Sequence, residues 1–204
     1  MENLVMKALL TKFFSLLILS LSYNTSALAQ NFTLLIPDFA VTQVAGSIGY
    51  LSVGAGYDLF KNQRGSLEFT YGHVPESKGG PLNIVSTKFA YRPFQIKLNS
   101  KAKIYPLNPG AFLSYHLDKQ FDFAFDKEQY GKSYYGWSTA LRGHLSLGNE
   151  IKFYTSGNKI KTVALYSEFN VSDLYLASIF YTNNKEWLKP KDIIKLGIGV
   201  KVGF

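Results

Sequence analysis

The sequence contains no cysteine, which excludes disulfide bonds and thiolate metal sites. Histidine is also scarce, and its three copies, His73, His116 and His144, do not have the spacing of a metal site. No low-complexity linker, internal repeat or block of like charge divides the chain. We therefore expect one folded domain and predict neither a metal ion nor another cofactor.

The N-terminal segment lacks the length of a membrane-spanning helix. Lys7 and Lys12 precede an apolar run at 13–21, and the small residues of Ala27-Leu28-Ala29 follow it. A spanning helix needs about 20 nearly continuous apolar residues. A basic start, a short apolar run and a small-residue end are instead typical of a secretory signal peptide. We predict that residues 1–29 are this signal and are removed.

The last residues of the chain alternate strictly in polarity. Residues at even-numbered positions are apolar, whereas those at odd-numbered positions are small or basic. The apolar set is Ile194, Leu196, Ile198, Val200, Val202 and Phe204, and the other set is Lys195, Gly197, Gly199, Lys201 and Gly203. Side chains with a period of two lie on opposite faces of a strand. One face could contact lipid while the other lines a polar interior, as in transmembrane barrels.

Seven earlier segments are predicted to be strands, although the facing of 174–181 is ambiguous. They lie at 50–59, 67–72, 85–92, 110–117, 134–147, 163–170 and 174–181. With the terminal strand they make eight, the smallest common closed barrel. Ten strands are possible if Phe121, Phe123 and Phe125 mark one further strand and residues 151–154 another.

The predicted fold is thus all-β, an eight-stranded antiparallel transmembrane β-barrel over residues 47–204. Residues 30–46 are treated as an N-terminal lead, in which 32–37 could form a strand, a helix or a flexible segment. A soluble sandwich or lipocalin-like barrel would also alternate, but would turn its apolar face inward. The signal peptide, the glycine-rich polar parity and the terminal aromatic residue favour the membrane version.

The signal peptide together with residues 47–204 resembles a small outer-membrane β-barrel protein of Gram-negative bacteria. In that superfamily the last strand is read by the barrel-assembly machinery, and this role falls on Phe204, Val202, Val200 and Ile198. The resemblance implies a location in the cell outer membrane. It implies no particular activity, because such barrels serve as anchors, adhesins, enzymes and pores.

The charge of the loops on each side of the membrane can be predicted if both termini face the periplasm. Connections at 61–65, 94–109, 148–161 and 182–192 would then face outward, with eleven basic residues against three acidic ones. Such loops would suit the phosphates of lipopolysaccharide, although ordinary solvated lysines explain them equally well. Basic loops of a membrane barrel also account for the high pI, so no nucleic-acid partner is predicted. The connection at 118–133 is long for a periplasmic turn.

Acidic and basic residues both lie on the strand faces that are assigned to the barrel interior. They are Asp58, Glu68, Lys88, Arg92, His116, Arg142, His144, Glu168, Lys195 and Lys201. A small barrel is just filled by its own side chains, and charges without bulk water need partners. We expect an ion-paired plug, with a gated path for small solutes as the alternative.

Two groups contain the residue types of a serine hydrolase, in which histidine activates serine and an acid orients histidine. His144 and Ser146 share a strand face and Glu168 could supply the acid. The second group, His73, Glu76 and Ser77, is close in sequence beside Pro75. A Ser-x-His pair, Ser114 and His116, is also present.

Pairs of polar residues two positions apart on one strand face occur often in polar barrel interiors, so such a pair does not by itself indicate catalysis. A structural or surface-interacting barrel is therefore the leading interpretation. A lipid A-modifying acyl hydrolase or transferase is the alternative, and a narrow pore is the third possibility.

Overall fold

The computed structural model describes residues 36–118, 121, 139–180, 189 and 193–204. The chain divides into two compact units, Met1–Pro37 and Asp38–Phe204, and the fold below is that of the second unit. The predicted signal peptide at 1–29 lies outside the described residues, as do Phe123 and Phe125.

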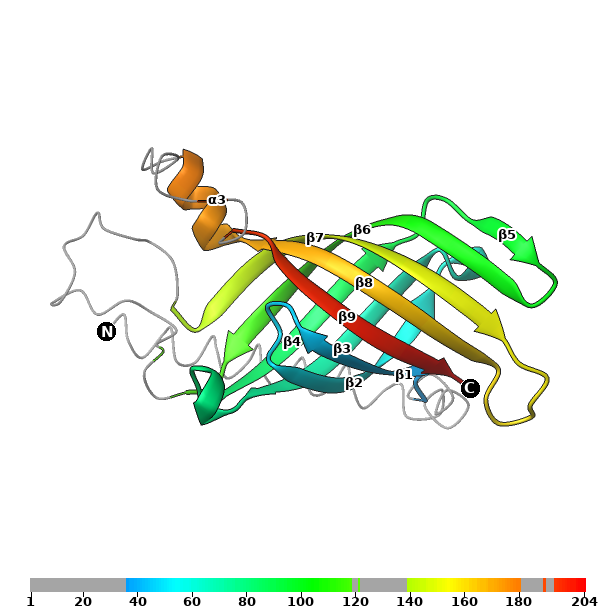
Figure 1. Cartoon of the computed structure of the whole chain (residues 1–204), viewed down its shortest axis with the longest axis horizontal. Coiled ribbons are helices and arrows are strands. Elements are labelled where there is room, and N and C mark those ends of the chain that lie inside the picture. The colour runs from blue at the N-terminus through cyan, green and yellow to red at the C-terminus, as the bar shows by residue number, and fades with distance from the viewer. Residues whose placement is uncertain (1–35, 119–120, 122–138, 181–188, 190–192) are drawn as a thin grey trace, which may run out of the picture. The chain divides into compact units, whose positions relative to one another are not determined.

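The described part of this second unit contains nine strands and a short helix (Figure 1). The strands are β1 (Phe39–Ala45), β2 (Leu51–Leu59), β3 (Gly65–Val74), β4 (Leu82–Tyr91), β5 (Ile96–Asn99), β6 (Ala102–His116), β7 (Leu141–Tyr154), β8 (Thr162–Ser172) and β9 (Lys195–Gly203). The helix α3 (Asp173–Phe180) follows β8, and single 3-10 turns η2 (Lys61–Gln63) and η3 (Glu76–Lys78) follow β2 and β3.

Eight of the strands close into an antiparallel barrel, as predicted. The order β4-β3-β2-β1-β9-β8-β7-β6 is closed by pairing between β4 and β6, while β5 pairs with β6 and extends the wall beyond β4. The first and last strands are neighbours, with Phe39 opposite Gly203 and Val44 opposite Ile198. Closure leaves no barrel strand with an unpaired edge, so the backbone groups are satisfied without water.

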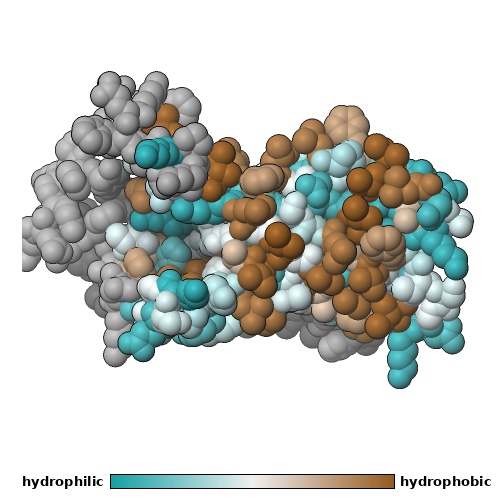
Figure 2. Space-filling model, in the orientation of Figure 1, coloured by the Kyte–Doolittle hydropathy of each residue, from teal (hydrophilic) through white to brown (hydrophobic). Residues whose placement is uncertain are grey.

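The barrel carries its apolar residues outside and its polar residues inside. Phe69, Leu113, Leu145, Leu165 and Ile198 are each about half exposed. The buried side chains are mostly polar or charged. Figure 2 shows apolar side chains spread over the visible wall of the barrel, with hydrophilic residues at its right-hand end. This distribution is the reverse of a soluble sandwich or lipocalin-like barrel and is typical of a transmembrane barrel.

The terminal strand has the predicted facing. Leu196, Ile198 and Phe204 are exposed, whereas Gly197, Gly199, Lys201 and Gly203 are buried. The other apolar members of its predicted assembly signal, Val200 and Val202, are partly exposed on the outer parity. Alternation separated the two faces of β9, and the glycine-rich polar parity and the terminal aromatic residue indicated correctly which face lies inside.

One predicted strand is wrong, and one strand of the closed barrel was missed. Residues 173–180 form α3, in which Asp173 Oδ1 accepts a hydrogen bond from the backbone N–H of Leu174. The segment that had been treated as an N-terminal lead contains β1, at Phe39–Ala45. Its inward side chains, Phe39, Val41 and Gln43, mix apolar and polar types, so polarity does not alternate along it. The two errors cancel in the number of strands that form the closed barrel.

The additional strand proposed at 151–154 is instead the end of β7, which runs without a break to Tyr154. Likewise, residues assigned to the connection at 94–109 belong largely to β5 and β6. Strands β6 and β7 are therefore longer than their clearest alternation indicated.

The missed strand changes which connections lie with the chain ends. The backbone N–H of Phe204 donates to Asp38 O at 3.0 Å, and that of Lys161 donates to Gly203 O at 2.8 Å. We call this the terminal end; it contains the connections at 60–64, 92–101 and 155–161. The turns at 46–50 and 75–81 and helix α3 lie at the other end, called the distal end.

The prediction that connections 61–65, 94–109 and 148–161 lie opposite the chain termini is therefore wrong. Apart from Lys189, the connection predicted at 182–192 lies outside the described residues. Consecutive strands run in opposite directions, so one additional strand near the start moves the connections that follow it to the other end of the barrel. The terminal end is the basic one, because 60–64, 92–101 and 155–161 contain seven basic residues and no acidic residue. The long connection after β6 begins at the distal end, so it is not on the same side as the termini.

Candidate functional site

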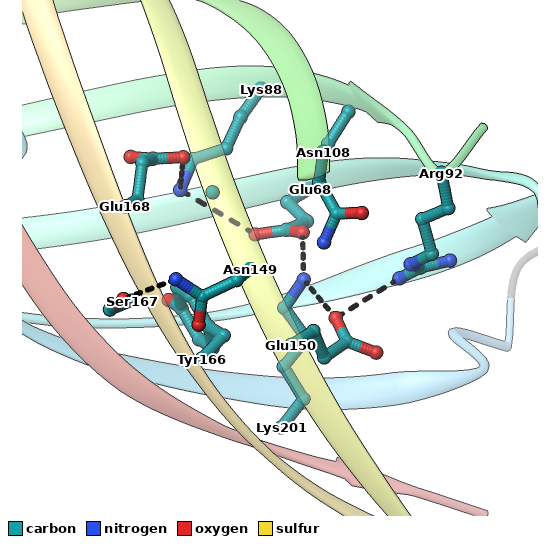
Figure 3. Close-up of a pocket in the computed structure, with 12 residues that line it drawn as sticks. Glu68, Lys88, Arg92, Asn108, Asn149, Glu150, Tyr166, Ser167, Glu168 and Lys201 are labelled. Atoms are coloured by element: carbon teal, nitrogen blue, oxygen red, sulfur yellow. Dashed lines mark hydrogen bonds and ion pairs between the residues drawn. The ribbon is translucent and has the colours of Figure 1, made fainter. Parts of the chain in front are cut away.

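Eight ionisable side chains form a network across the middle of the barrel, referred to here as the central network. Figure 3 shows part of it, namely Glu68, Lys88, Arg92, Glu150, Glu168 and Lys201. It contains four acids and four bases from strands far apart in the sequence. They are Asp58, Glu68, Glu150, Glu168, Lys88, Arg92, Lys152 and Lys201. The formal charges cancel, as a water-poor interior requires.

Lys201 lies at the centre of this network. Its Nζ is 2.7 Å from Glu68 Oε1 and 3.3 Å from Glu150 Oε2. Lys88 extends the network on one side, with Nζ 3.1 Å from Glu168 Oε2 and 3.9 Å from Glu68 Oε2. Every one of these five side chains is 90% or more buried. The contacts tie β3, β4, β7, β8 and β9 together.

Arg92 and Lys152 extend the network toward the terminal end. The Arg92 guanidinium donates to Asp58 Oδ1 at 3.2 Å, to Glu150 Oε2 at 3.4 Å and to the Gln63 carbonyl at 2.7 Å. Lys152 Nζ lies 3.7 Å from Glu150 Oε1 and 3.9 Å from Asp58 Oδ2. Glu150 thus faces three cations.

Aromatic and amide groups complete the packing. The Tyr166 hydroxyl donates to Gln43 Oε1 at 2.9 Å, and Lys88 Nζ donates to the same oxygen at 3.2 Å. Lys201 Nζ lies 4.7 Å from the centroid of the Tyr166 ring. Gly199 is directly opposite Tyr166, and a Cβ there would lie 2.5 Å from the ring. Glycine at this position makes room for the tyrosine.

Little space remains between these groups. The cavity bordered by Glu68, Lys88, Arg92, Glu150 and Lys201 has a volume of about 20 Å³. A cavity of roughly 10–15 Å³ is needed to hold one water molecule. The centre of the barrel is therefore filled and ion-paired.

The distal end is hollow by comparison. A cavity of about 450 Å³ opens there, and we call it the distal cup. Its charged lining residues among those described are Lys78, Arg142 and Lys195, and His116 and His144 also line it. No Asp or Glu side chain from the described part of the chain is among its lining residues.

Contacts in the cup are of a different kind from those of the central network. Lys78 Nζ lies 5.7 Å from the ring centroid of Tyr50, and Lys195 Nζ lies 5.8 Å from that of Tyr175. These are cation–π contacts, which leave ammonium N–H groups available to another acceptor.

The floor of the cup is more tightly held. His144 stacks on Phe112 with ring centroids 4.2 Å apart, and its Nε2 is 2.9 Å from Ser114 Oγ. His144 and Ser114 are therefore fixed relative to each other.

The predicted interior cluster therefore divides in two. Asp58, Glu68, Lys88, Arg92, Glu168 and Lys201 are in the central network, whereas His116, Arg142, His144 and Lys195 line the distal cup. All face inward, but only the first group is ion-paired with described residues.

The first catalytic group is not assembled. His144 Nε2 meets Ser114 and not Ser146, whose buried Oγ has no hydrogen-bond partner, and Glu168 is bound to Lys88. Residues two apart on a strand are separated by roughly 6.5 Å along the backbone, so a cross-strand neighbour is within easier reach. Ser114 itself is fully buried, which prevents access by a substrate.

The second group lies at the surface. His73 is exposed on the outer face of β3, where its Nδ1 is 2.9 Å from Asn83 Oδ1. Glu76 and Ser77 are exposed in turn η3. No hydrogen bond joins His73 to either of them within the described part of the chain, and Ser114 pairs with His144 instead of with His116.

Sequence reasoning missed four members of the interior: Gln43, Glu150, Lys152 and Tyr166. Glu150 and Lys152 had been assigned to a loop, yet they continue the even parity of Arg142 and His144 on the same strand. Tyr166 shares the parity of Glu168. Extending each alternation by a few residues would have found these three, whereas Gln43 lies on the strand that was not recognised.

Comparison with known proteins adds little. No protein-family model matches the chain, and no curated protein is significantly similar to it. A solved structure described as "De novo design of transmembrane beta-barrels" is similar with a TM-score of 0.37 and 14% sequence identity, covering 83% of this chain and 98% of that chain. A similarity of this size supports no functional assignment.

Metal sites and membrane-spanning helices were also considered. Among the described residues, no three His, Cys, Asp or Glu side chains are arranged to hold a metal ion. None of the described helices is both long enough and apolar enough to span a membrane.

Proposed function

We propose that this protein is a non-conducting β-barrel of a bacterial outer membrane, with a structural or surface-interacting role. The observation that carries the proposal is the neutral central network, which fills a barrel whose outer wall is apolar. Apolar side chains suit a lipid environment. Four acids and four bases held by one another leave no open water path, which a pore would need.

The arrangement of the ends suggests an orientation. In barrels of this type the short turns face the periplasm and the longer connections face outward. The two longest connections, between β6 and β7 and between β8 and β9, begin at the distal end, so the terminal end would face the periplasm and the distal cup would face outward. The basic connections of the terminal end would then not contact lipopolysaccharide phosphates, contrary to the expectation from the sequence.

The partners that fit this function are those of an outer-membrane barrel. Outer-membrane lipid and lipopolysaccharide would surround the apolar wall. The barrel-assembly machinery would bind the last strand through Phe204, Val202, Val200 and Ile198, of which Phe204 and Ile198 are exposed. A cleaved signal at 1–29 would direct export.

A lipid A acyl hydrolase is supported less well. The Ser114–His144 contact has the length of a nucleophile–base hydrogen bond. However, Ser114 is fully buried, and His144 Nδ1 has no hydrogen-bond partner that would orient the ring. We therefore assign no catalytic residue.

Conductance across a planar lipid bilayer tests the proposal. The purified protein is expected to insert without producing steady current. The double variant Lys88→Ala with Glu168→Ala keeps the interior neutral but removes the pair that blocks one side of the lumen, so it should admit ions. The exposed Glu76→Gln variant is the control and should stay closed.

Two results would contradict the proposal. One is a stable open channel formed by the unmodified protein, which would favour the pore. The other is recovery of the protein in the aqueous fraction of cells after membranes are sedimented, which would rule out the membrane location.

A further inference from the structure

We infer that the distal cup is a binding site for a phosphate group carried by a small organic molecule or by a lipid headgroup. The inference does not depend on the barrel being non-conducting, nor on which side of the membrane the cup faces. It depends on three features of the cup: its cations, its buried nitrogen atoms and its size.

The cations of the cup come from three separate elements and have no carboxylate partner in the described part of the chain. Arg142 is on β7, Lys195 is at the start of β9 and Lys78 ends turn η3. In the central network every base meets an acid within 4.0 Å, but within the described part of the chain no such pair involves these three. Placing like charges around one cavity costs free energy unless an anion is bound among them.

Arginine and lysine together suit phosphate in particular. A guanidinium can donate two parallel hydrogen bonds to neighbouring phosphate oxygens, and lysine adds point charge. A phosphate monoester offers three oxygens and a charge of about −1.5 to −2 at neutral pH. Three cations around one cavity match that charge better than they match a single carboxylate.

His144 provides the second observation. The residue is 93% buried at the floor of the cup, and its Nδ1 has no hydrogen-bond partner among the described residues. Nε2 is already used by Ser114. When the Ser114 hydroxyl donates to Nε2, Nδ1 carries the hydrogen and is a donor without an acceptor. Buried donors in folded proteins are normally satisfied, and a phosphate oxygen would satisfy this one.

The size of the cup indicates that the phosphate is attached to something larger. Ligand sites are typically about 300–1,000 Å³, and the cup measures about 450 Å³. Tyr50, Tyr175 and Ile84 contribute aromatic and aliphatic surface to its lining. The remainder of a phosphorylated ligand, such as a sugar ring, would contact these side chains.

Isothermal titration calorimetry of the full chain in a non-ionic detergent tests the site, with pyrophosphate as the soluble probe. Saturable binding is expected. Arg142→Gln and Lys195→Gln should each raise the Kd about tenfold, which corresponds to about 1.4 kcal/mol, because each variant loses a charge-assisted hydrogen bond to the probe. Lys97→Gln and Lys159→Gln remove exposed lysines at the terminal end and should leave the Kd within about twofold, since each is far from the cup.

Nanodiscs distinguish the two sources of phosphate. The same titration is made in zwitterionic nanodiscs with and without bisphosphorylated lipid A. If the lipid headgroup occupies the cup, lipid A will weaken pyrophosphate binding to the unmodified protein. If the natural ligand is a free solute, the Kd will be the same in both. Absence of saturable binding in every medium, or equal effects of Arg142→Gln and Lys97→Gln, would overturn the inference.

Discussion

The central network and the distal cup are built from the same residue types on the same inward face of the strands, yet they differ in how their charges are satisfied. In the centre, Lys201 and Glu68 are 2.7 Å apart. In the cup, Lys195 and Lys78 rest over tyrosine rings instead. The first arrangement stabilises and closes the barrel, whereas the second leaves charge available to a ligand. Substitutions in the two regions should therefore have opposite consequences for stability and for binding.

The largest effect is expected from Glu150→Gln in the central network. Glu150 is 2% exposed and faces Arg92, Lys152 and Lys201. Removing its charge leaves three buried cations with too few partners, so the free energy of unfolding should fall by about 3–5 kcal/mol. Urea unfolding in detergent micelles, followed by circular dichroism, measures the change.

Glu76→Gln is the matched control for this experiment, because Glu76 is exposed in turn η3. Its effect should be below about 0.5 kcal/mol. Equal stabilities of the two variants would mean that the central pairs contribute nothing to the fold.

A smaller loss is expected from Gly199→Ala, which tests the packing around the network. The added Cβ would lie 2.4 Å from Thr42 O and 2.5 Å from the Tyr166 ring. Such overpacking typically costs about 1–3 kcal/mol. Gly143→Ala is the control near the cup, since its Cβ would meet nothing closer than Asp173 Cβ at 4.0 Å. If both substitutions are tolerated equally in urea unfolding, Tyr166 is not tightly enclosed.

Ser114→Ala should have a more modest effect, because it removes a single hydrogen bond to His144 at the floor of the cup. The expected loss is about 1 kcal/mol. Ser146→Ala removes a buried hydroxyl that has no partner, so stability should be unchanged or slightly higher. A thermal unfolding series compares the two, and the reverse order would indicate that His144 pairs with Ser146 after all.

The smallest effect on stability is expected from Arg142→Gln in the cup. Arg142 has no ion pair with a described carboxylate, so its loss should change the free energy of unfolding by less than about 0.5 kcal/mol. Urea unfolding without added anion measures this value. A loss comparable to that of Glu150→Gln would show that the cup is already an ion-paired structure.

Two elements, strand β1 and helix α3, were predicted incorrectly from the sequence, each for a physical reason. Strand β1 was missed because Gln43 is polar and Val41 apolar on the same inward face, which removes the alternation. Helix α3 was taken for a strand because apolar residues continue through Leu174, Tyr175 and Leu176. A short apolar run does not distinguish strand from helix. The strand count stayed correct, but the side assigned to the loops did not.

Sequence alone determined the barrel class, the facing of most strands and six of the eight members of the central network, because alternation with a period of two fixes the face of each side chain. It did not determine which inward groups meet. That was decided by the register between strands, which places His144 beside Ser114 and brings Lys201 to both Glu68 and Glu150. Ion pairs and cavities depend on distances between strands distant in the chain. Only closure of the barrel sets those distances.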